Sequence, residues 1–196
     1  RIPEKYKDFE CTKVSFACKH KGAMIEPMDK SILYCYLPTS ASWGFPFLMN
    51  TDMIPKGDRN DIEKEVTLVG DDEKNFNQEL AVIAGVKLFC WIKDLLTSKQ
   101  YQLGSVFSLI PDFKKCIKEH DFYEDYIKKF AESFNECIEN DQIVPVRQGI
   151  ANVKNVILDT TGLTTSGILS DEEFYKFSGM EDSYLPLPML RKDKHF

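Results

Sequence analysis

Residues 33–62 read LYCYLPTSASWGFPFLMNTDMIPKGDRNDI, and this stretch decides the fold. The segments 31–37 and 45–51 are rich in aromatic and branched side chains, which favour β-strands. Because both segments are continuously apolar, we expect them to be central strands covered on both faces of a sheet. Such strands would hold out the polar loop that follows at 55–61.

The elements around this stretch predict an α+β fold. Alternation over 11–18 indicates another strand, and the turn residues within 20–30 indicate a hairpin-like loop. A long helix is predicted over 76–97, where apolar residues recur at helical spacing. The stripe consists of Leu80, Ile83, Ala84, Leu88, Trp91 and Leu95. We therefore expect a small mixed β-sheet covered by a long helix.

The second half of the chain is expected to be mostly helical. Residues 105–110 predict a short helix or strand before a proline. A helix is predicted from Asp121 to about residue 139, with Glu124 three residues on as the partner of Asp121 in a capping box. Short strands are expected at 142–146 and 152–158.

Near the end of the chain, local signals define one more helix. Ser170 and Glu173 predict a second capping box, and Gly179 predicts the point where the helix stops. The tail 184–196 contains two prolines and then charged residues. We expect this tail to lie extended over the surface.

The chain has 196 residues, enough for one large domain or two small ones. We expect an α+β domain at 1–100 and a mostly helical extension with a few short strands at 101–196, with a soft boundary near 98–104. The formal net charge of −6 disfavours nucleic acids and anionic membranes as partners. No apolar run approaches the ~20 residues that a membrane helix needs.

The six cysteines are scattered, and none forms a C-x-x-C pair. Several of them, such as Cys35 and Cys90, lie in apolar runs, where free thiols behave as small hydrophobic side chains. This usage predicts reduced, mostly inaccessible cysteines and a cytoplasmic protein. Because the chain opens with Arg1 rather than Met, we expect a fragment whose neighbouring domains are missing.

The loop that carries Lys56 and Arg59 is the leading candidate for a functional site. A guanidinium group suits a phosphate because it donates parallel hydrogen bonds and stays charged at any working pH. We expect Gly57 to adopt a positive φ angle that turns backbone N–H groups toward an anion. The alternative is a solvated turn in which Arg59 pairs with Asp58 or Asp61.

A set of motifs surrounds this loop: Leu-Pro-Thr at 37–39, Phe-Pro-Phe at 45–47, Asn50 and Arg59. The set, within residues 14–96, resembles the middle (second) domain of sacsin-related, Hsp90-like ATPases of the GHKL superfamily. Such ATPases usually carry serine-arginine-glutamate at the arginine, whereas this chain has aspartate-arginine-asparagine at 58–60. This departure leaves open whether Arg59 reaches a phosphate or is held locally.

The resemblance implies a chaperone-like ATPase in which this domain does no chemistry alone. ATP and Mg would bind to an upstream ATP-binding domain of the same chain, and this fragment would hold no cofactor and would not be an enzyme in isolation. Arg59 would be the catalytic residue that reaches the γ-phosphate, assisted by Lys56, and Asn50 would brace the strand end. Client proteins or a second copy of the chain are further implied partners.

Motifs for an ATP site or a metal site within this chain are weak. Glu136 and Asn140 match the Glu-x-x-x-Asn pattern of the superfamily, and Asp159 faintly resembles its adenine-contacting aspartate. We reject this match because no glycine-rich lid follows at a suitable distance. Cys116 and His120 are four residues apart, but a metal ion needs three or four ligands, so no metal site is expected.

A non-catalytic protein–protein interaction module is the alternative from another functional class. Trp43, beside Gly44 in a loop between the two predicted strands, would anchor an interface together with the tail 184–196. The plainer interpretation is that Trp43 packs onto its own sheet. An aromatic stripe in the second half is interpreted as core; it consists of Phe122, Tyr126, Phe130 and Phe134.

Overall fold

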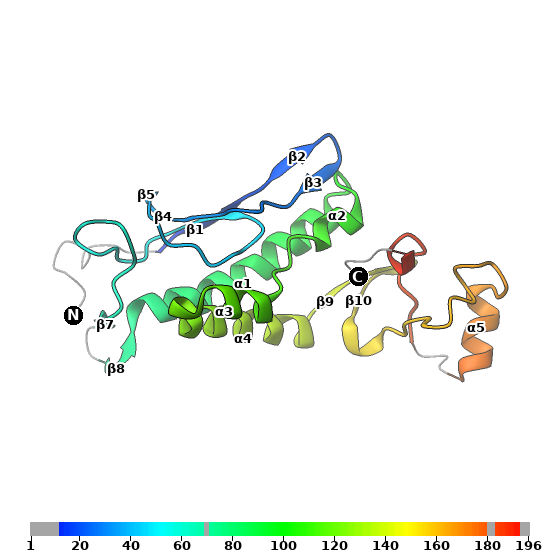
Figure 1. Cartoon of the computed structure of the whole chain (residues 1–196). Helices are drawn as coiled ribbons and strands as arrows, with labels where there is room; N and C mark the ends of the chain where they lie inside the picture. Colours follow the sequence, from blue (N-terminus) through cyan, green and yellow to red (C-terminus); the bar gives the residue numbers. More distant parts are fainter. Residues whose placement is uncertain (1–11, 69–70, 180–182, 193–196) are drawn as a thin grey trace.

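The computed structural model describes residues 12–68, 71–179 and 183–192. Its small mixed sheets and its helices confirm the predicted α+β class. Helix α1 (Phe76–Thr97) spans the same residues as the predicted long helix. Figure 1 shows α1 running through the middle of the molecule, with the sheet on one side and two further helices, α3 and α4, on the other.

The main sheet has four strands in the order β1-β6-β4-β5. They are β1 (Val14–Ala17), β6 (Leu48–Thr51), β4 (Leu33–Cys35) and β5 (Leu37–Pro38). The sheet is mixed because β6 pairs with β4 in parallel, whereas the β1–β6 and β4–β5 pairs are antiparallel. The expected hairpin follows β1, with β2 (Lys19–Lys21) paired to β3 (Met24–Glu26).

The remaining strands form two further pairs. Strand β7 (Thr67–Leu68) pairs with β8 (Asp71–Asn75), directly before α1. Strand β9 (Gln142–Val146) spans the residues predicted for it and pairs with β10 (Gly149–Asn152). The strand predicted at 152–158 is instead the end of β10 followed by a 3-10 turn, η3 (Val153–Asn155).

Each apolar segment contains a strand, β4 or β6, as predicted, but the expectation that both faces of the strand are covered is wrong for β6. Strand β6 alternates, with Met49 and Thr51 buried and Asn50 exposed. Phe45 and Phe47 are buried, but they lie in irregular backbone before β6. The segment 45–51 is continuously apolar because its irregular residues before β6 also enter the core. The strand β6 itself has one buried face and one exposed face.

The second half contains all the other α-helices of the described part. Its helices are α2 (Leu103–Phe107), α3 (Phe113–Glu119), α4 (Glu124–Asn140) and α5 (Asp171–Ser178), with 3-10 turns η2 (Asp121–Tyr123) and η4 (Leu190–Lys192). None of the helices in 12–68, 71–179 and 183–192 is both long and apolar enough to cross a membrane.

One of the two predicted capping boxes forms. In α5 the Ser170 hydroxyl accepts a hydrogen bond from the Glu173 amide, the Glu173 carboxylate accepts from Ser170, and Gly179 ends the helix at φ 67°. The box predicted for Asp121 and Glu124 is wrong. Residues 121–123 form η2, so α4 begins three residues later, with no side-chain cap.

In the segment 183–192, the expectation that the tail lies extended over the surface is only partly met, because some of its side chains are buried. Tyr184 and Pro186 bridge to Val156 and Val146, and Leu185 and Leu190 are buried. These contacts fasten the segment 183–192 to the β9–β10 hairpin. Residues 193–196, the rest of the predicted tail, lie outside the described residues.

Trp43 is buried, which corrects the suggestion that it anchors an interface. Only 3% of its surface is exposed. Its ring stacks on Tyr126 of α4 at a centroid distance of 6.0 Å and meets the rings of Phe45 and Phe130 edge-on. The loop tryptophan is therefore part of the contact between the sheet and α4.

The cysteines divide by exposure. Burial raises the pKa of the Cys35 thiol to about 12 and that of Cys116 to about 11. Cys90 is exposed, which corrects its expected burial. Its apolar run lies on α1, where Phe89 and Ile92 turn inward and Cys90 turns outward. No disulfide joins the five described cysteines, and Cys11 lies outside the described residues.

Helices α1 and α4 come into very close contact at Gly85. A Cβ atom built on Gly85 would lie 2.2 Å from Ser133 Oγ and 2.3 Å from the Phe130 carbonyl oxygen. The Ser133 hydroxyl also donates a hydrogen bond to the Val82 carbonyl oxygen, at 2.8 Å. A single core cluster therefore contains side chains from both sides of the boundary expected at 98–104.

We predict that Gly85→Ala destabilises the protein. Glycine to alanine in an exposed helix interior normally stabilises by about 0.5–1 kcal/mol. Here the new methyl group meets the backbone of α4, and overpacking of this kind costs about 1–3 kcal/mol. Urea denaturation measures the change. Gly57→Ala is the matched control, because nothing lies within 4 Å of its added Cβ; equal stability of both variants would contradict the close contact.

Candidate functional site

The loop at 55–61 is a compact turn closed by backbone hydrogen bonds. Pro55 and Ile62 form a β-bridge. Inside it the Lys56 amide donates to the Asp61 carbonyl oxygen at 2.8 Å, and the Arg59 amide donates to the Lys56 carbonyl oxygen at 2.9 Å. The loop is thus a defined turn with Arg59 near its tip.

Arg59 adopts the left-handed backbone conformation, with φ 60°. The positive φ expected at Gly57 is wrong, because Gly57 is not among the residues with positive φ. The physical cause is the Asp58 side chain, which accepts hydrogen bonds from the Asn60 amide at 3.1 Å and from its side-chain nitrogen at 3.3 Å. This Asx-type turn places the left-handed residue at position 59.

The base of the loop is fastened to α1 by Asn77, whose side chain is fully buried. Its Oδ1 accepts a hydrogen bond from the Ile54 amide at 2.8 Å. Its Nδ2 donates to the carbonyl oxygens of Ile54 at 3.0 Å and of Glu63 at 2.7 Å. One amide side chain in the first turn of α1 therefore holds both ends of the loop.

A second anchor joins the loop to η2, just before α4. The Tyr123 hydroxyl donates to Asp61 Oδ1 at 2.7 Å, and Lys56 Nζ lies 3.2 Å from Asp61 Oδ2. Lys64 Nζ donates to the Phe122 carbonyl oxygen at 3.0 Å and lies 3.3 Å from the centre of the Phe122 ring. Burial, and then the hydrogen bond to Asp61, raise the pKa of Tyr123, so its hydroxyl remains a donor at any working pH.

The Arg59 side chain is exposed and makes no ion pair with any residue of the described part. The two carboxylates that the sequence suggested as partners of Arg59 have other partners. Asp58 bonds to Asn60, and Asp61 bonds to Lys56 and Tyr123. A pair between Arg59 and either aspartate is therefore not formed. Among the described residues, no ion pair compensates the charge of its guanidinium.

The other two predicted site residues are engaged locally. Lys56 is held by Asp61, with 40% of its side chain exposed. Asn50 lies at the end of β6, and its Oδ1 accepts a hydrogen bond from the Tyr36 amide at 3.1 Å, in the turn between β4 and β5. The Ser40 amide donates to the Asn60 carbonyl oxygen at 3.0 Å, which places the segment after β5 beside the loop.

The loop lines none of the clefts characterised in the described part of the chain. Within the residues that the structure describes, no three His, Cys, Asp or Glu side chains gather as metal ligands. Cys116 instead donates to the Gly44 carbonyl oxygen at 3.5 Å, and the His120 ring packs against Gly44.

The rejected ATP motif makes local hydrogen bonds. Asn140 Nδ2 donates to the Glu136 carbonyl oxygen at 2.9 Å. Both Asp159 oxygens accept from the hydroxyls and amides of Thr161 and Thr164, which lowers the pKa of Asp159. These side chains stabilise the end of α4 and one turn.

Sequence reasoning missed Asn77 and Tyr123, which position the loop. A signal for Asn77 was available, because it precedes Leu80 and Ala81 on the buried side of α1, where a polar side chain needs partners. Tyr123 gave no such signal, since its contact to Asp61 spans 62 residues.

Comparison with models of protein families, with curated protein sequences and with solved structures found no significant match. The site is therefore interpreted from its own geometry and from the motifs in the sequence.

We predict that Asn77→Ala destabilises the fold and loosens the loop. The change leaves the buried Ile54 amide and two carbonyl oxygens without their partner, and each unsatisfied buried group costs about 1–3 kcal/mol. Denaturant unfolding measures the loss, and hydrogen exchange at Ile54 reports on the loop. Asn60→Ala, at an exposed position of the same loop, is the control. A loss no larger than that of the control would show that Asn77 does not hold the loop.

Proposed function

We propose that this chain is the coupling domain of an Hsp90-like, sacsin-related ATPase with a chaperone-like role. In this proposal an upstream domain of the same protein binds ATP and Mg, and Arg59 is offered to the γ-phosphate when the two domains close. Client proteins or a second copy would be further partners. A cytoplasmic location is part of the proposal, and the free thiols support it.

The observation that carries the proposal is the state of Arg59. The side chain is exposed, its neighbouring carboxylates are occupied, and its backbone is in the left-handed region. That conformation costs a residue with a Cβ on the order of 1 kcal/mol or more and suits glycine better. A cation kept in this position, on a turn fastened to α1, is suited to contact an anion outside the domain.

The anchors of the loop would transmit a contact between Arg59 and a phosphate to the rest of the domain. Asn77 fastens the loop to α1 and Tyr123 fastens it to η2. A phosphate that attracts the Arg59 guanidinium would therefore displace the loop together with its anchors on α1 and η2. An arginine donor to developing phosphate charge in a closed, drier site contributes about 3–4 kcal/mol, enough to bias a domain closure.

The contacts separate the roles of the three proposed residues. Arg59 is the catalytic residue, since its guanidinium is available. Lys56 would have to leave Asp61 before it could bind a phosphate, so we assign it a secondary part in cofactor binding. Asn50 acts indirectly, because its Oδ1 holds the turn after β4 in place.

We predict that the isolated chain does not bind Mg-ATP tightly. The Arg59 loop lines none of the clefts characterised in the described part, and the sequence lacks the motifs that form a nucleotide pocket. Calorimetric titration with millimolar Mg-ATP is the measurement. Stoichiometric binding would mean that a complete nucleotide site lies within this chain. It would contradict the proposal that ATP binds to an upstream domain.

We further predict that Arg59→Ala lowers ATP turnover by the full-length protein on the order of tenfold to a thousandfold, because a donor to the transferring phosphate is lost. Nucleotide affinity should change little, since the adenine and ribose contacts belong to the other domain. Steady-state ATPase rates and nucleotide titrations separate the two effects.

Two variants control for the backbone and for charge. Arg59→Gly relieves the left-handed backbone, so it should be at least as stable as Arg59→Ala while equally impaired in turnover. Lys118→Ala removes an exposed cation far along the chain from the loop and should leave turnover unchanged. Normal turnover in a folded Arg59→Ala protein would rule out the phosphate contact.

A further inference from the structure

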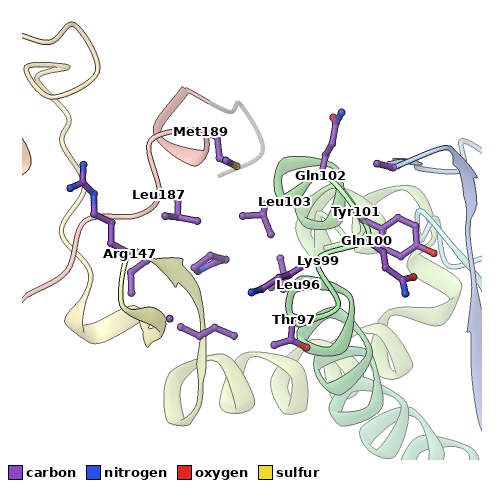
Figure 2. Close-up of a pocket in the computed structure, with 15 residues that line it drawn as sticks. Leu96, Thr97, Lys99, Gln100, Tyr101, Gln102, Leu103, Arg147, Leu187 and Met189 are labelled. Carbon is purple, nitrogen blue, oxygen red and sulfur yellow. The ribbon is translucent and has the colours of Figure 1, made fainter.

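A cleft of about 710 Å³ opens at the end of α1 opposite the Arg59 loop. Its walls are the turn between α1 and α2, the β9–β10 hairpin and the segment before η4 (Figure 2). Sites for small ligands typically have volumes of about 300–1,000 Å³. The cleft is thus large enough for a small organic molecule.

The lining of the cleft is mainly apolar. Side chains from all three walls contribute: Leu96, Leu103, Val146, Ile150, Leu187 and Met189. Figure 2 shows Leu103 and Leu187 on opposite walls. Met189 is 63% exposed although it lines this apolar surface. An apolar chain placed here would bury surface that water now contacts.

The charged residues that line the cleft are all basic. The chain carries 31 acidic and 25 basic residues, yet the lining contains Lys99 and Arg147 and no aspartate or glutamate. Arg147 is engaged, because its Nε lies 3.1 Å from Asp171 Oδ2. Lys99 forms no ion pair within the described residues. Among the described residues, Lys99 is therefore the cation of this lining that has no ion pair, and it lies beside an apolar surface.

The position of Lys99 is set by the backbone at the end of α1. Ser98 caps the helix, with its amide donating to the Asp94 carbonyl oxygen at 2.9 Å, and Lys99 follows with φ 56°. Its amine extends into the space between α1 and the hairpin (Figure 2). A lysine amine has three donors, and a carboxylate is a matching acceptor.

We propose that this cleft binds a small amphipathic anion, a medium-chain carboxylate, with the acyl chain on the apolar walls and the carboxylate on Lys99. The alkyl chain matches the apolar lining, and the negative head matches a site with a cation and no acidic side chain. Neither argument depends on the proposed ATPase function, and the site lies at the other end of α1 from Arg59.

The test uses the chain as it stands and a series of octanoate, decanoate and dodecanoate below their micelle concentrations. Isothermal titration should give saturable binding of one ligand per chain, tightening by about three- to fourfold for each added methylene group. Decanol and decyltrimethylammonium carry the same chain with a neutral or a positive head. Both should bind more weakly than decanoate.

Three variants locate the site. Lys99→Gln should weaken decanoate about three- to tenfold and leave decanol unchanged, because a charge-assisted contact is lost. Met189→Glu places a negative charge on an exposed lining position and should weaken decanoate more than tenfold. Lys87→Gln, at an exposed position of α1 outside the cleft, should change nothing.

Three results would overturn the proposal. The first is the absence of saturable binding. The second is unchanged decanoate affinity in Met189→Glu, which would place the ligand elsewhere. The third is an effect of Lys99→Gln no larger than that of Lys87→Gln, which would show that the cleft does not select an anion.

Discussion

The close contact of α1 with α4 at Gly85 is the constraint on which the rest of the structure depends. Ser133 and the backbone of Phe130 occupy the space that a side chain at position 85 would need. On the sheet side, the rings of Trp43 and Phe45 also contact Phe130. The two halves of the chain therefore share one core, with α1 as their common wall.

Helix α1 also links the two surfaces to which we assign functions. Its 22 residues span about 33 Å at 1.5 Å per residue. Asn77 in its first turn holds the Arg59 loop, and Leu96 in its last turn lines the cleft beside Lys99. A helix packed along its length moves as one body, so events at the two ends have a physical path for coupling. Coupling itself requires that each ligand favour a different position of the helix.

The candidate site was predictable in its residue types and not in its geometry. The motifs around Arg59 predicted a loop that presents cations, because arginine and lysine suit anions, and Arg59 does lie exposed near the tip of that loop. The partners of each cation were not predictable. Asp61 takes Lys56 and Tyr123 rather than Arg59, and this choice depends on where η2 lies relative to the loop. Asn77 owes its role to three backbone groups 14 to 23 residues away.

The sequence by itself determined the features that arise from interactions within one or two helical turns. The span of α1 follows from apolar periodicity, and the cap and stop of α5 follow from Ser170, Glu173 and Gly179. Tertiary structure alone decided that Trp43 is buried and that β6 has an exposed face. The physical reason is that a residue's own chemistry sets its local hydrogen bonds, whereas its burial depends on which distant segment packs against it.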